Sequence, residues 1–399
     1  MEYSNRNIQI VNKDFPMLED TMLTLEKKLI EQGTILTPRI VCEILQNLIS
    51  ENTKDSIKEI LVPGSGSGRI LNIFKELNAS ITAIEINPLL VTLSESFHPD
   101  VNHFPVDFLT WKDDKKFDLI VGHFPIGYGQ TKSTHLENEF FKKSLEFLTE
   151  DGTLICIVPD SFLVINKYED TRKHVIRNYS LEAVLNLPKV FFPNIYIGSS
   201  VVVVRKRKQK DNVYFGLIKN DQTVSEKFSV ASDILTNRWD MSYYDPKHIE
   251  LANKLMGLET KELSELAEVI RGNNYKSDEI KTSGEFLILS GKNLKEDAIT
   301  LTPKDRYINM ISKKDQFKVL KSGDIIVNLL FNERKLYVYK DSDPKAVISN
   351  NCAIIRSTQN QYIKTYLSTP DGKEIFAMQT DRLQSGTTIS FLNISNLKK

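Results

Sequence analysis

The sequence predicts an α/β protein: a mainly parallel β-sheet in its N-terminal part and a second, mixed α/β domain behind it. Two observations support this prediction. Between residues 57 and 204, short apolar runs of strand length alternate with stretches of helical spacing, and a glycine-rich segment follows the first run. After Leu251 the pattern changes to many short apolar runs separated by Gly, Asn and Asp turns.

Composition limits the class of protein. The chain of 399 residues is long enough for two or three domains, and its 41% hydrophobic and 26% charged residues are typical of a globular protein. The 52 basic and 52 acidic residues cancel, so any nucleic-acid contact has to come from local basic patches. On composition alone, a protein without nucleic-acid contacts is an equally open interpretation.

The cysteines and the N-terminus indicate the compartment. Cys42, Cys156 and Cys352 are far apart and show no CxxC spacing, so neither a disulfide framework nor a zinc site is expected. Residues 1–6 show no secretory signal, and no apolar run is long enough to span a membrane. We therefore expect a cytoplasmic protein without a metal site, a view supported by the absence of metal-ligand spacing among His98, His103 and His135.

Apolar periodicity predicts the elements in order. A first helix is expected over residues 17–31, and a second begins after Thr37-Pro38, because Pro is favoured in the first helical turn. Alternating strands and helices favour a parallel sheet covered on both faces, and the two adjacent late strands could supply an antiparallel edge. In all, strands are expected at residues 60–62, 81–86, 117–121, 154–158, 181–187 and 199–204. Helices are expected between them at residues 69–77, 89–97 and 136–148.

Changes in the residue pattern divide the rest of the chain into parts. A basic run, Arg205 to Lys210, is either a solvated strand end or a phosphate-contacting patch. One helix is expected over residues 251–270. The predicted parts are an N-terminal helical segment (1–32), the sheet domain (33–210), a connector (211–250) and the second domain (251–399).

A candidate nucleoside site lies at the ends of successive predicted strands. Glycine in the loop between the first strand and its helix lets the backbone approach a ligand closely. Glu85 ends the next strand, where a Rossmann-like site needs a carboxylate for ribose hydroxyls. Asp107 and Phe108 follow, and could bind the amine and the face of an adenine ring. A tight turn and surface carboxylates are the alternative. The loop residues are Pro63, Gly64, Gly66 and Gly68.

At this point the sequence resembles the gamma-class N6-adenine DNA methyltransferases, especially type I modification subunits. The resemblance implies a Rossmann-like class I methyltransferase domain that binds S-adenosylmethionine through the residues above, with Thr37 near the methionine part. Val62 replaces the leading acidic residue of the family, which is expected to weaken cofactor binding without abolishing it. The matching segments are Gly33 to Pro38 ("YTP"), Val62 to Leu71 ("DPACGSGGFL"), Ala83 to Pro88, Asp107 to Leu109, Gly152 to Asp160 ("GGRLAFVVP"), Leu185 to Pro188 and Phe191 to Pro193 ("LP…F").

The catalytic motif departs from this family. The family carries Asn-Pro-Pro-aromatic, in which the Asn side chain and a Pro carbonyl accept hydrogen bonds from the adenine N6 amine and the ring stacks on the flipped base. This chain has His123, Phe124, Pro125 and Ile126 instead. A neutral imidazole and the Phe124 carbonyl could accept the amine hydrogens, and Phe124 or Tyr128 could stack. Retained methylation and a decayed site both stay open. Gly122 to Gln130 also resembles the "DLPVGYY" motif of a little-studied group of class I methyltransferases.

The C-terminal part resembles the target-recognition domains of type I specificity subunits and fused type II enzymes. The resemblance implies that polar loop side chains read base edges while lysines contact phosphates. Lys276, Lys292, Lys295 and Arg334 are either such contacts or solvated charges. The matching segments are Arg238 to Pro246 ("RLDPEYYNP"), Leu263 to Gly272 ("LSEIAEIIRG"), Phe286 to Gly291, Leu320 to Val327, Tyr366 to Gly372 and Ser385 to Ile389.

These resemblances imply a sequence-specific, S-adenosylmethionine-dependent adenine-N6 methyltransferase of a restriction-modification-type system, acting on double-stranded DNA. The alternative is a catalytically degenerate DNA-binding or specificity protein that acts with a partner. A small-molecule or RNA methyltransferase with an unrelated tail is a third, less supported interpretation. A homodimer, or a second methyltransferase, specificity or restriction subunit, is the expected partner, and no membrane partner is expected. No restriction-nuclease motif is evident in the chain.

Overall fold

The computed structural model of the protein shows two compact units, Met1–Gly152 and Thr153–Lys399. The helix expected over residues 17–31 lies outside the described residues. Within the described part of the chain, no helix is long and apolar enough to cross a membrane. The structure describes residues 36–52, 57–127, 135–192, 198–210, 212–256, 261–295, 298–328, 335–385 and 388–389.

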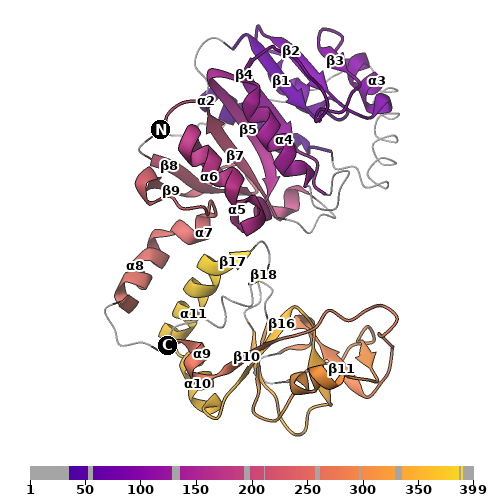
Figure 1. Ribbon diagram of the computed structural model, residues 1–399, viewed down its shortest axis with the longest axis vertical. Helices are drawn as coiled ribbons and strands as arrows, with labels where there is room; N and C mark the ends of the chain where they lie inside the picture. The colour runs from indigo at the N-terminus through magenta and orange to yellow at the C-terminus, as the bar shows by residue number, and fades with distance from the viewer. Residues whose placement is uncertain are drawn as a thin grey trace. The chain divides into compact units, whose positions relative to one another are not determined.

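The first unit is built on parallel strands in the order β3-β2-β1-β4 (Figure 1). β1 pairs in parallel with β2 and β4, and β2 pairs in parallel with β3. Ile60, Leu61 and Val62 of β1 are all 0% exposed, as expected for a strand covered on both faces. The bounds are β1 (Glu59–Pro63), β2 (Ser80–Ile84), β3 (Asn102–Phe104) and β4 (Phe117–His123).

Helices follow the strands of this unit as predicted, with one difference. Asn87 caps the third helix by accepting a hydrogen bond from Leu89 N at 3.0 Å. The helix expected at 69–77 is a 3₁₀ helix, in which the Asn72 side chain bonds the Arg69 carbonyl at 3.1 Å and competes with α-helical bonding. The bounds are α2 (Arg39–Asn52), η1 (Arg69–Phe74), α3 (Pro88–Phe97) and α4 (Leu136–Glu146).

In the second unit, strands continue in the order β5-β7-β6-β8-β9, and β5 begins in the first unit. β7 pairs antiparallel with both β5 and β6, so the expected antiparallel strand is present but lies inside the sheet and not at its edge. The prediction of a connector over residues 211–250 is wrong for β8 and β9, since β8 pairs in parallel with β6. The bounds are β5 (Leu148–Pro159), β6 (Ser180–Leu187), β7 (Ser199–Arg205), β8 (Asn212–Ile218) and β9 (Val224–Ala231).

The predicted mostly parallel, Rossmann-like arrangement is therefore confirmed. Two helices not predicted from the sequence, α5 (Asp160–Val164) and α6 (Glu169–Asn178), connect β5 to β6. Short strands with few apolar residues, such as β3, were also missed, because they lack a strong periodic signal.

A buried arginine fastens the segment that follows β9. Arg172 of α6 is 0% exposed and donates hydrogen bonds to the carbonyls of Phe162 at 2.5 Å, Ile165 at 3.0 Å and Asn237. Trp239, also 0% exposed, donates its backbone N–H to the Leu163 carbonyl at 2.9 Å. The segment around residues 237–239 is therefore docked on α5 and α6.

The C-terminal region is a mixed α/β domain, as predicted. It contains an antiparallel sheet in the order β10-β16-β13-β14 and a three-stranded sheet in the order β12-β11-β15. The helix expected over residues 251–270 is instead the end of α8, a short α9 and strand β10. The bounds are α7 (Met241–Tyr244), α8 (Pro246–Met256), α9 (Leu263–Leu266), β10 (Glu268–Arg271), β11 (Phe286–Leu289), β12 (Tyr307–Ile308), β13 (Ile325–Asn328), β14 (Leu336–Val338), β15 (Ala346–Ile348), β16 (Cys352–Arg356), α10 (Asn360–Ser368), α11 (Pro370–Leu383), β17 (Gln384–Ser385) and β18 (Thr388–Ile389).

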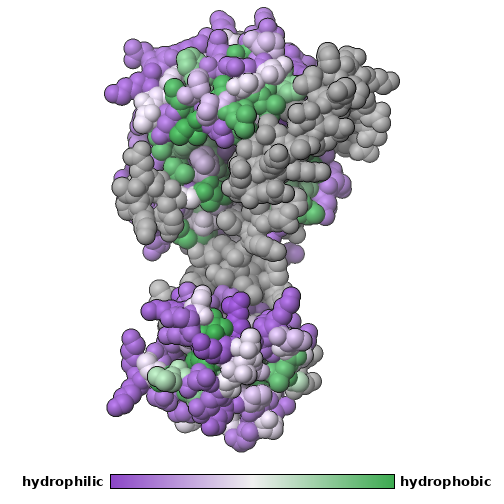
Figure 2. Space-filling model, turned by 90° about the vertical axis from the view of Figure 1, so that its right-hand side faces the viewer, coloured by the Kyte–Doolittle hydropathy of each residue, from purple (hydrophilic) through white to green (hydrophobic). Residues whose placement is uncertain are grey.

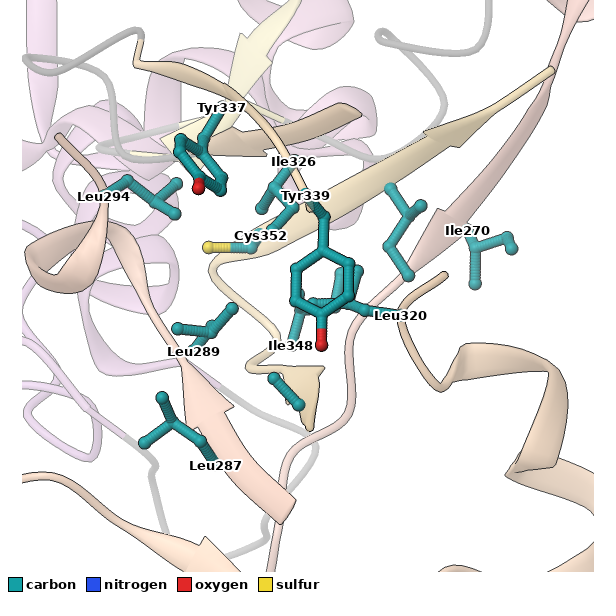
Figure 3. Packing of buried hydrophobic residues seen from close by; sticks show 12 residues of the cluster. Ile270, Leu287, Leu289, Leu294, Leu320, Ile326, Tyr337, Tyr339, Ile348 and Cys352 are labelled. Carbon is teal, nitrogen blue, oxygen red and sulfur yellow. The ribbon is translucent and has the colours of Figure 1, made fainter. Parts of the chain in front are cut away.

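Alternate residues of the central strands of this sheet serve two cores, because side chains alternate along a strand. Ile325 of β13 packs in a cluster with Ile363 and Phe376 from α10 and α11. Its neighbour Ile326 packs in the opposite cluster with Leu289 of β11. Figure 3 shows the second cluster converging between the strands. The antiparallel sheet is thus covered by helices on one face and by the smaller sheet on the other.

The molecular surface is mainly hydrophilic on the face shown in Figure 2, with hydrophobic residues in small groups. Some large hydrophobic side chains are nevertheless exposed. Ile86 is 65% exposed and Leu89 51%, and Phe104 and Val106 are each 37% exposed. All four lie beside the ends of β2 and β3, where Glu85 and Asp107 are found.

The Arg172 anchor predicts a large loss of stability on substitution. Burial lowers the pKa of Arg172 to about 10, so the guanidinium is still charged at neutral pH. Arg172→Met keeps the aliphatic stem and leaves buried carbonyls without donors, at a cost of about 3 kcal/mol in the free energy of unfolding. Denaturant-induced unfolding followed by circular dichroism measures the change.

Arg177→Met is the matched control, because Arg177 is exposed on the same helix. It should change the unfolding free energy by less than about 0.5 kcal/mol. Equal losses for the two variants would contradict an anchoring role for Arg172.

Candidate active site

The loop after β1 turns through glycines in the left-handed region. The φ angles of Gly64, Gly66 and Gly68 are 69°, 58° and 83°, a conformation that other residues rarely adopt. Gly64 N donates to the carbonyl of Ile84 at 2.8 Å, which folds the loop over the end of β2. The loop leaves β1 at Pro63, its last residue.

Two of these glycines meet different surroundings. A Cβ at Gly68 would lie 2.4 Å from Ser94 Oγ, so this glycine permits close packing on α3. A Cβ at Gly66 would have only Leu36 Cδ2 nearby, at 3.9 Å. The backbone at Gly66 therefore borders open space that a ligand can approach.

Glu85 is fixed beside this space. Its Oε2 accepts a hydrogen bond from Gly66 N at 2.9 Å, and its Oε1 accepts one from Asn87 N at 2.9 Å. A carboxylate has about four lone-pair positions. The two backbone bonds therefore leave one acceptor position on each oxygen, which suits the two hydroxyls of a ribose.

Asp107 lies at the same edge of the sheet, one strand away. Phe104 pairs in register with Ile84, and its carbonyl accepts the Glu85 N–H at 3.2 Å. Neighbouring strands are about 4.8 Å apart, so the segment carrying Asp107 runs beside the end of β2. Asp107 Oδ1 accepts a hydrogen bond from Leu109 N at 2.9 Å, which fixes the turn.

Phe108 occupies a different place from the one its predicted role requires. Its side chain is 2% exposed, its ring centroid is 5.0 Å from that of Phe140, and Lys143 Nζ lies 5.2 Å from its centroid. In this conformation the ring belongs to the aromatic core, not to the ligand-facing surface.

The apolar side chains that do face outward here were not singled out from the sequence. Ile86 directly follows Glu85 and is 65% exposed, and Val106 directly precedes Asp107 and is 37% exposed. An apolar residue next to a carboxylate at a strand end was the available signal. These two aliphatic side chains lie between Glu85, the candidate acceptor for ribose hydroxyls, and Asp107, the candidate acceptor for an adenine amine. Their exposed apolar surface suits the faces of a purine ring.

The loop after β4 comes to the same place. A Cβ at Gly64 would lie 4.0 Å from both the His123 carbonyl oxygen and Pro125 Cδ. The order β2-β1-β4 reverses the direction of strand addition at β1, and ligands of open α/β sheets bind at such a switch point. The glycine loop and the His123 loop flank this position.

The structure also joins Thr37 to His123. Thr37 Oγ1 lies 3.2 Å from His123 Nδ1, although the residues are 86 positions apart. Burial lowers the pKa of His123 to about 4, so the imidazole is neutral at physiological pH. A neutral imidazole has one donor and one acceptor nitrogen. The predicted hydrogen-bond acceptor for an amine is thus in the required charge state.

The other residues of the motif have separate roles. Phe124 is 1% exposed and its ring centroid is 5.8 Å from that of Phe140, so it cannot stack on a base in this conformation and offers only its carbonyl. Pro125 and Ile126 are partly exposed. Tyr128, the other suggested stacking residue, lies outside the described residues.

A buried carboxylate supports this loop and was missed in the sequence. Glu137, 2% exposed, accepts a hydrogen bond from Gly127 N at 3.2 Å and lies 3.3 Å from His135 Nδ1. It therefore anchors the chain on both sides of residues 128–134. Its position in the first turn of α4, where acidic residues are favoured, was the only local signal.

Some of the basic residues considered for phosphate binding form ion pairs with carboxylates of the protein. Glu182 accepts Arg207 Nη2 at 2.7 Å and lies 3.1 Å from Lys210 Nζ, and Lys292 Nζ lies 3.4 Å from Asp305 Oδ1. These pairs favour the structural interpretation of the run that contains Arg207 and Lys210. Arg334 lies outside the described residues.

Together, these features fit the adenosine part of S-adenosylmethionine. An open backbone at Gly66, free acceptor positions on Glu85 and exposed aliphatic side chains at Ile86 and Val106 are what the nucleoside requires. The fit depends on the backbone of the loop and on Glu85, so the absence of an acidic residue at position 62 does not remove it.

Comparisons with known proteins show similarity to DNA methylases over part of the chain. Residues 74–238 match the family model described as N-6 DNA Methylase. The Type II methyltransferase M.TthHB8I of Thermus thermophilus is 30% identical over 176 residues, which are 37% of this chain and 39% of that protein. The modification methylase CviBIII of Paramecium bursaria Chlorella virus NC1A is 34% identical over 169 residues, which are 39% of this chain and 44% of that protein.

A solved structure of a putative class I S-adenosylmethionine-dependent methyltransferase from Listeria monocytogenes is also similar, with 16% identity and a TM-score of 0.45 over 50% of this chain and 72% of that chain. The matched stretch spans less than half the length of the two curated relatives. The family match and these relatives agree with the resemblance of the motifs: residues 74–238 are similar to the N-6 DNA Methylase family.

Proposed function

We propose that the protein is an S-adenosylmethionine-dependent DNA methyltransferase of restriction-modification type that methylates the N6 amine of an adenine flipped out of duplex DNA. One observation carries the proposal: a Cβ at Gly64 of the glycine loop would lie 4.0 Å from both the His123 carbonyl oxygen and Pro125 Cδ, so the two loops run side by side. Methyl transfer needs donor and acceptor about 3–3.5 Å apart, so the loops that hold them have to be neighbours. The glycine loop and the His123 loop meet this requirement.

Glu85 and the glycine loop would hold the cofactor. The free acceptor positions on Glu85 would take the ribose hydroxyls, Asp107 the adenine amine, and Ile86 and Val106 the ring faces. Thr37, beside His123, would border the methionine part. When bound, S-adenosylmethionine supplies an electrophilic methyl group on its sulfonium.

His123 and the Phe124 carbonyl would hold the target. Each would accept one hydrogen of the N6 amine, which raises electron density on the nitrogen that attacks the methyl group. Pro125 fixes the turn that aims this carbonyl. Ile126 would give the base an aliphatic contact in place of an aromatic stack.

The C-terminal domain is proposed to recognise the DNA target. Support comes from the segments that resemble recognition domains, because they form regular elements of this region: residues 263–271 contain α9 and β10, and residues 325–327 form most of β13. Since a single recognition domain reads a single half-site, a second copy of the chain or a separate specificity, methyltransferase or restriction subunit is the proposed partner. The cytoplasm, where DNA is accessible, is the proposed compartment.

The alternative is a DNA-binding protein that no longer transfers methyl groups. Two observations favour it: Ile126 stands where an aromatic ring is expected, and the ring of Phe124 is buried. Both remove stacking on the flipped base, so turnover has to be tested directly.

Cofactor binding should depend on the charge of Glu85. Glu85→Gln keeps the side chain's size but replaces one acceptor oxygen with an amide donor, so cofactor affinity should fall about 10- to 100-fold, as for a lost charge-assisted hydrogen bond. Isothermal titration calorimetry with S-adenosylmethionine measures the change. Glu95→Gln on the exposed side of α3 is the control and should bind like the wild type.

Methyl transfer is tested with tritiated cofactor on mixed duplex DNA, for the wild type and for His123→Asn. We expect label in adenine with the wild type, because a neutral imidazole can replace the amide oxygen. Label with His123→Asn alone would establish a decayed site. If neither the wild type nor His123→Asn transfers label, and calorimetry shows no cofactor binding, the proposal that the protein is a methyltransferase is refuted.

The pH profile should reflect the lowered pKa of His123. Its ordinary value is 6.5, but burial lowers it to about 4, so the neutral acceptor persists as the pH falls from 8 to 5. Transfer should therefore be insensitive to His123 protonation in this range and fall only near pH 4, where the ring becomes a double donor. A decline centred near pH 6.5 that disappears in His123→Asn would contradict the assignment.

A further inference from the structure

A loop of the C-terminal domain carries two large apolar side chains in solvent. Met310 is 87% exposed and Phe317 is 47% exposed. They mark the two ends of the segment that leaves β12 and forms most of the 3₁₀ helix η6 (Lys313–Lys318), and we call residues 310–317 the Met310 loop. Single exposed apolar residues are common on protein surfaces. Two of this size at the two ends of one short loop form a surface that a partner can bind.

The Met310 loop is fixed at its base. Gln316 Nε2 donates a hydrogen bond to the Ile311 carbonyl at 3.2 Å, which brings the two ends of the loop toward each other. Ile311 and Val319 pack against the buried cluster on the outer face of the smaller sheet. Just before the loop, Asn309 Oδ1 accepts a hydrogen bond from Glu285 N at 3.0 Å. The exposed apolar side chains are therefore displayed by an anchored segment.

Positive charge lies between the two apolar ends. Residues 310–318 contain three lysines and one aspartate, so they have an excess of two positive charges. Lys318 Nζ lies 3.1 Å from Asp315 Oδ1, and these two charges neutralise each other. Lys313 and Lys314 are exposed, and neither forms an ion pair with a carboxylate in the part of the chain that the structure describes. The unneutralised charge of the loop therefore belongs to these two lysines.

We propose that the Met310 loop enters a groove of duplex DNA, with Lys313 and Lys314 on phosphates and with Met310 and Phe317 against bases and sugars. Lysines bind the DNA backbone by replacing its counterions, and Phe and Met are among the apolar side chains that proteins insert between base steps. The inference rests on the proposed function, in which the C-terminal domain recognises DNA, and names a surface that does so. A protein partner suits the loop less well, because protein–protein interfaces are depleted in lysine.

The first test measures the affinity of the full chain for a fluorescein-labelled, mixed-sequence duplex by fluorescence anisotropy at several KCl concentrations. Lys313→Gln and Lys314→Gln should each reduce the steepness of log affinity against log salt by about 0.9, because each variant loses one phosphate contact. Met310→Gln should weaken binding about tenfold without changing the steepness, because it removes an apolar contact, and Met310→Leu should bind like the wild type. Unchanged affinity and steepness in all the loop variants would overturn the proposal.

Lys364→Gln is the matched control for the lysine variants. Lys364 is exposed on α10, which covers the opposite face of the antiparallel sheet from the smaller sheet. This variant should bind the duplex with the affinity and the steepness of the wild type. A loss equal to that of Lys313→Gln would mean that any lysine of the domain contributes alike, and would contradict a specific role for the loop.

The second test locates the DNA directly. Phe317→p-benzoylphenylalanine places a photoreactive ring in the loop, and irradiation should cross-link it to the bound duplex. Tyr362→p-benzoylphenylalanine is the matched control, because Tyr362 is 46% exposed on α10. It should give little cross-linking. Equal yields at the two positions, or no cross-link at position 317 while the duplex is bound, would contradict the proposal.

The two tests and the methyl-transfer assay separate this inference from the proposed function. Transfer by the wild type, with DNA binding unaltered in every loop variant, would refute the role of the loop and leave the methyltransferase. Duplex binding that depends on the loop, without transfer or cofactor binding, would refute the methyltransferase and leave the DNA-binding loop. Absence of duplex binding by the wild type would refute both.

Discussion

The position of β1 is the constraint on which the site depends. β2 lies on one side of β1 and β4 on the other, so the loops that leave β1 and β4 start side by side. Residues 60–62 of β1 are fully buried, and a shift of one residue would move each side chain to the opposite face. The buried strand thereby fixes where both loops begin, and the hydrogen bond from Gly66 N to Glu85 Oε2 ties the first loop to β2.

Local sequence was sufficient to predict the glycine loop and the place of Glu85. Gly64, Gly66 and Gly68 adopt backbone angles that favour glycine, and Glu85 follows a strand whose apolar run marks its end. Both signals are contained in a few consecutive residues. Most strands of the sheet and the helices α2, α3 and α4 were predictable for the same reason, whereas β3, β8, β9, α5 and α6 were missed.

Contacts between distant segments could not be predicted in this way. Phe108 follows a carboxylate at a strand end, like a ligand-facing residue, yet its ring is buried against Phe140 and Lys143 of α4. The buried state of Glu137 depends on a loop that returns to it, and the bond from Thr37 to His123 joins positions 86 residues apart. Each depends on packing that only the folded chain reveals.

The state of His123 bears on whether the site still works. Burying a polar ring costs free energy unless its nitrogens are bonded. Here burial keeps the imidazole neutral, and Thr37 supplies a partner for one nitrogen. A neutral charge and a defined tautomer are the two conditions under which an imidazole can replace an amide oxygen.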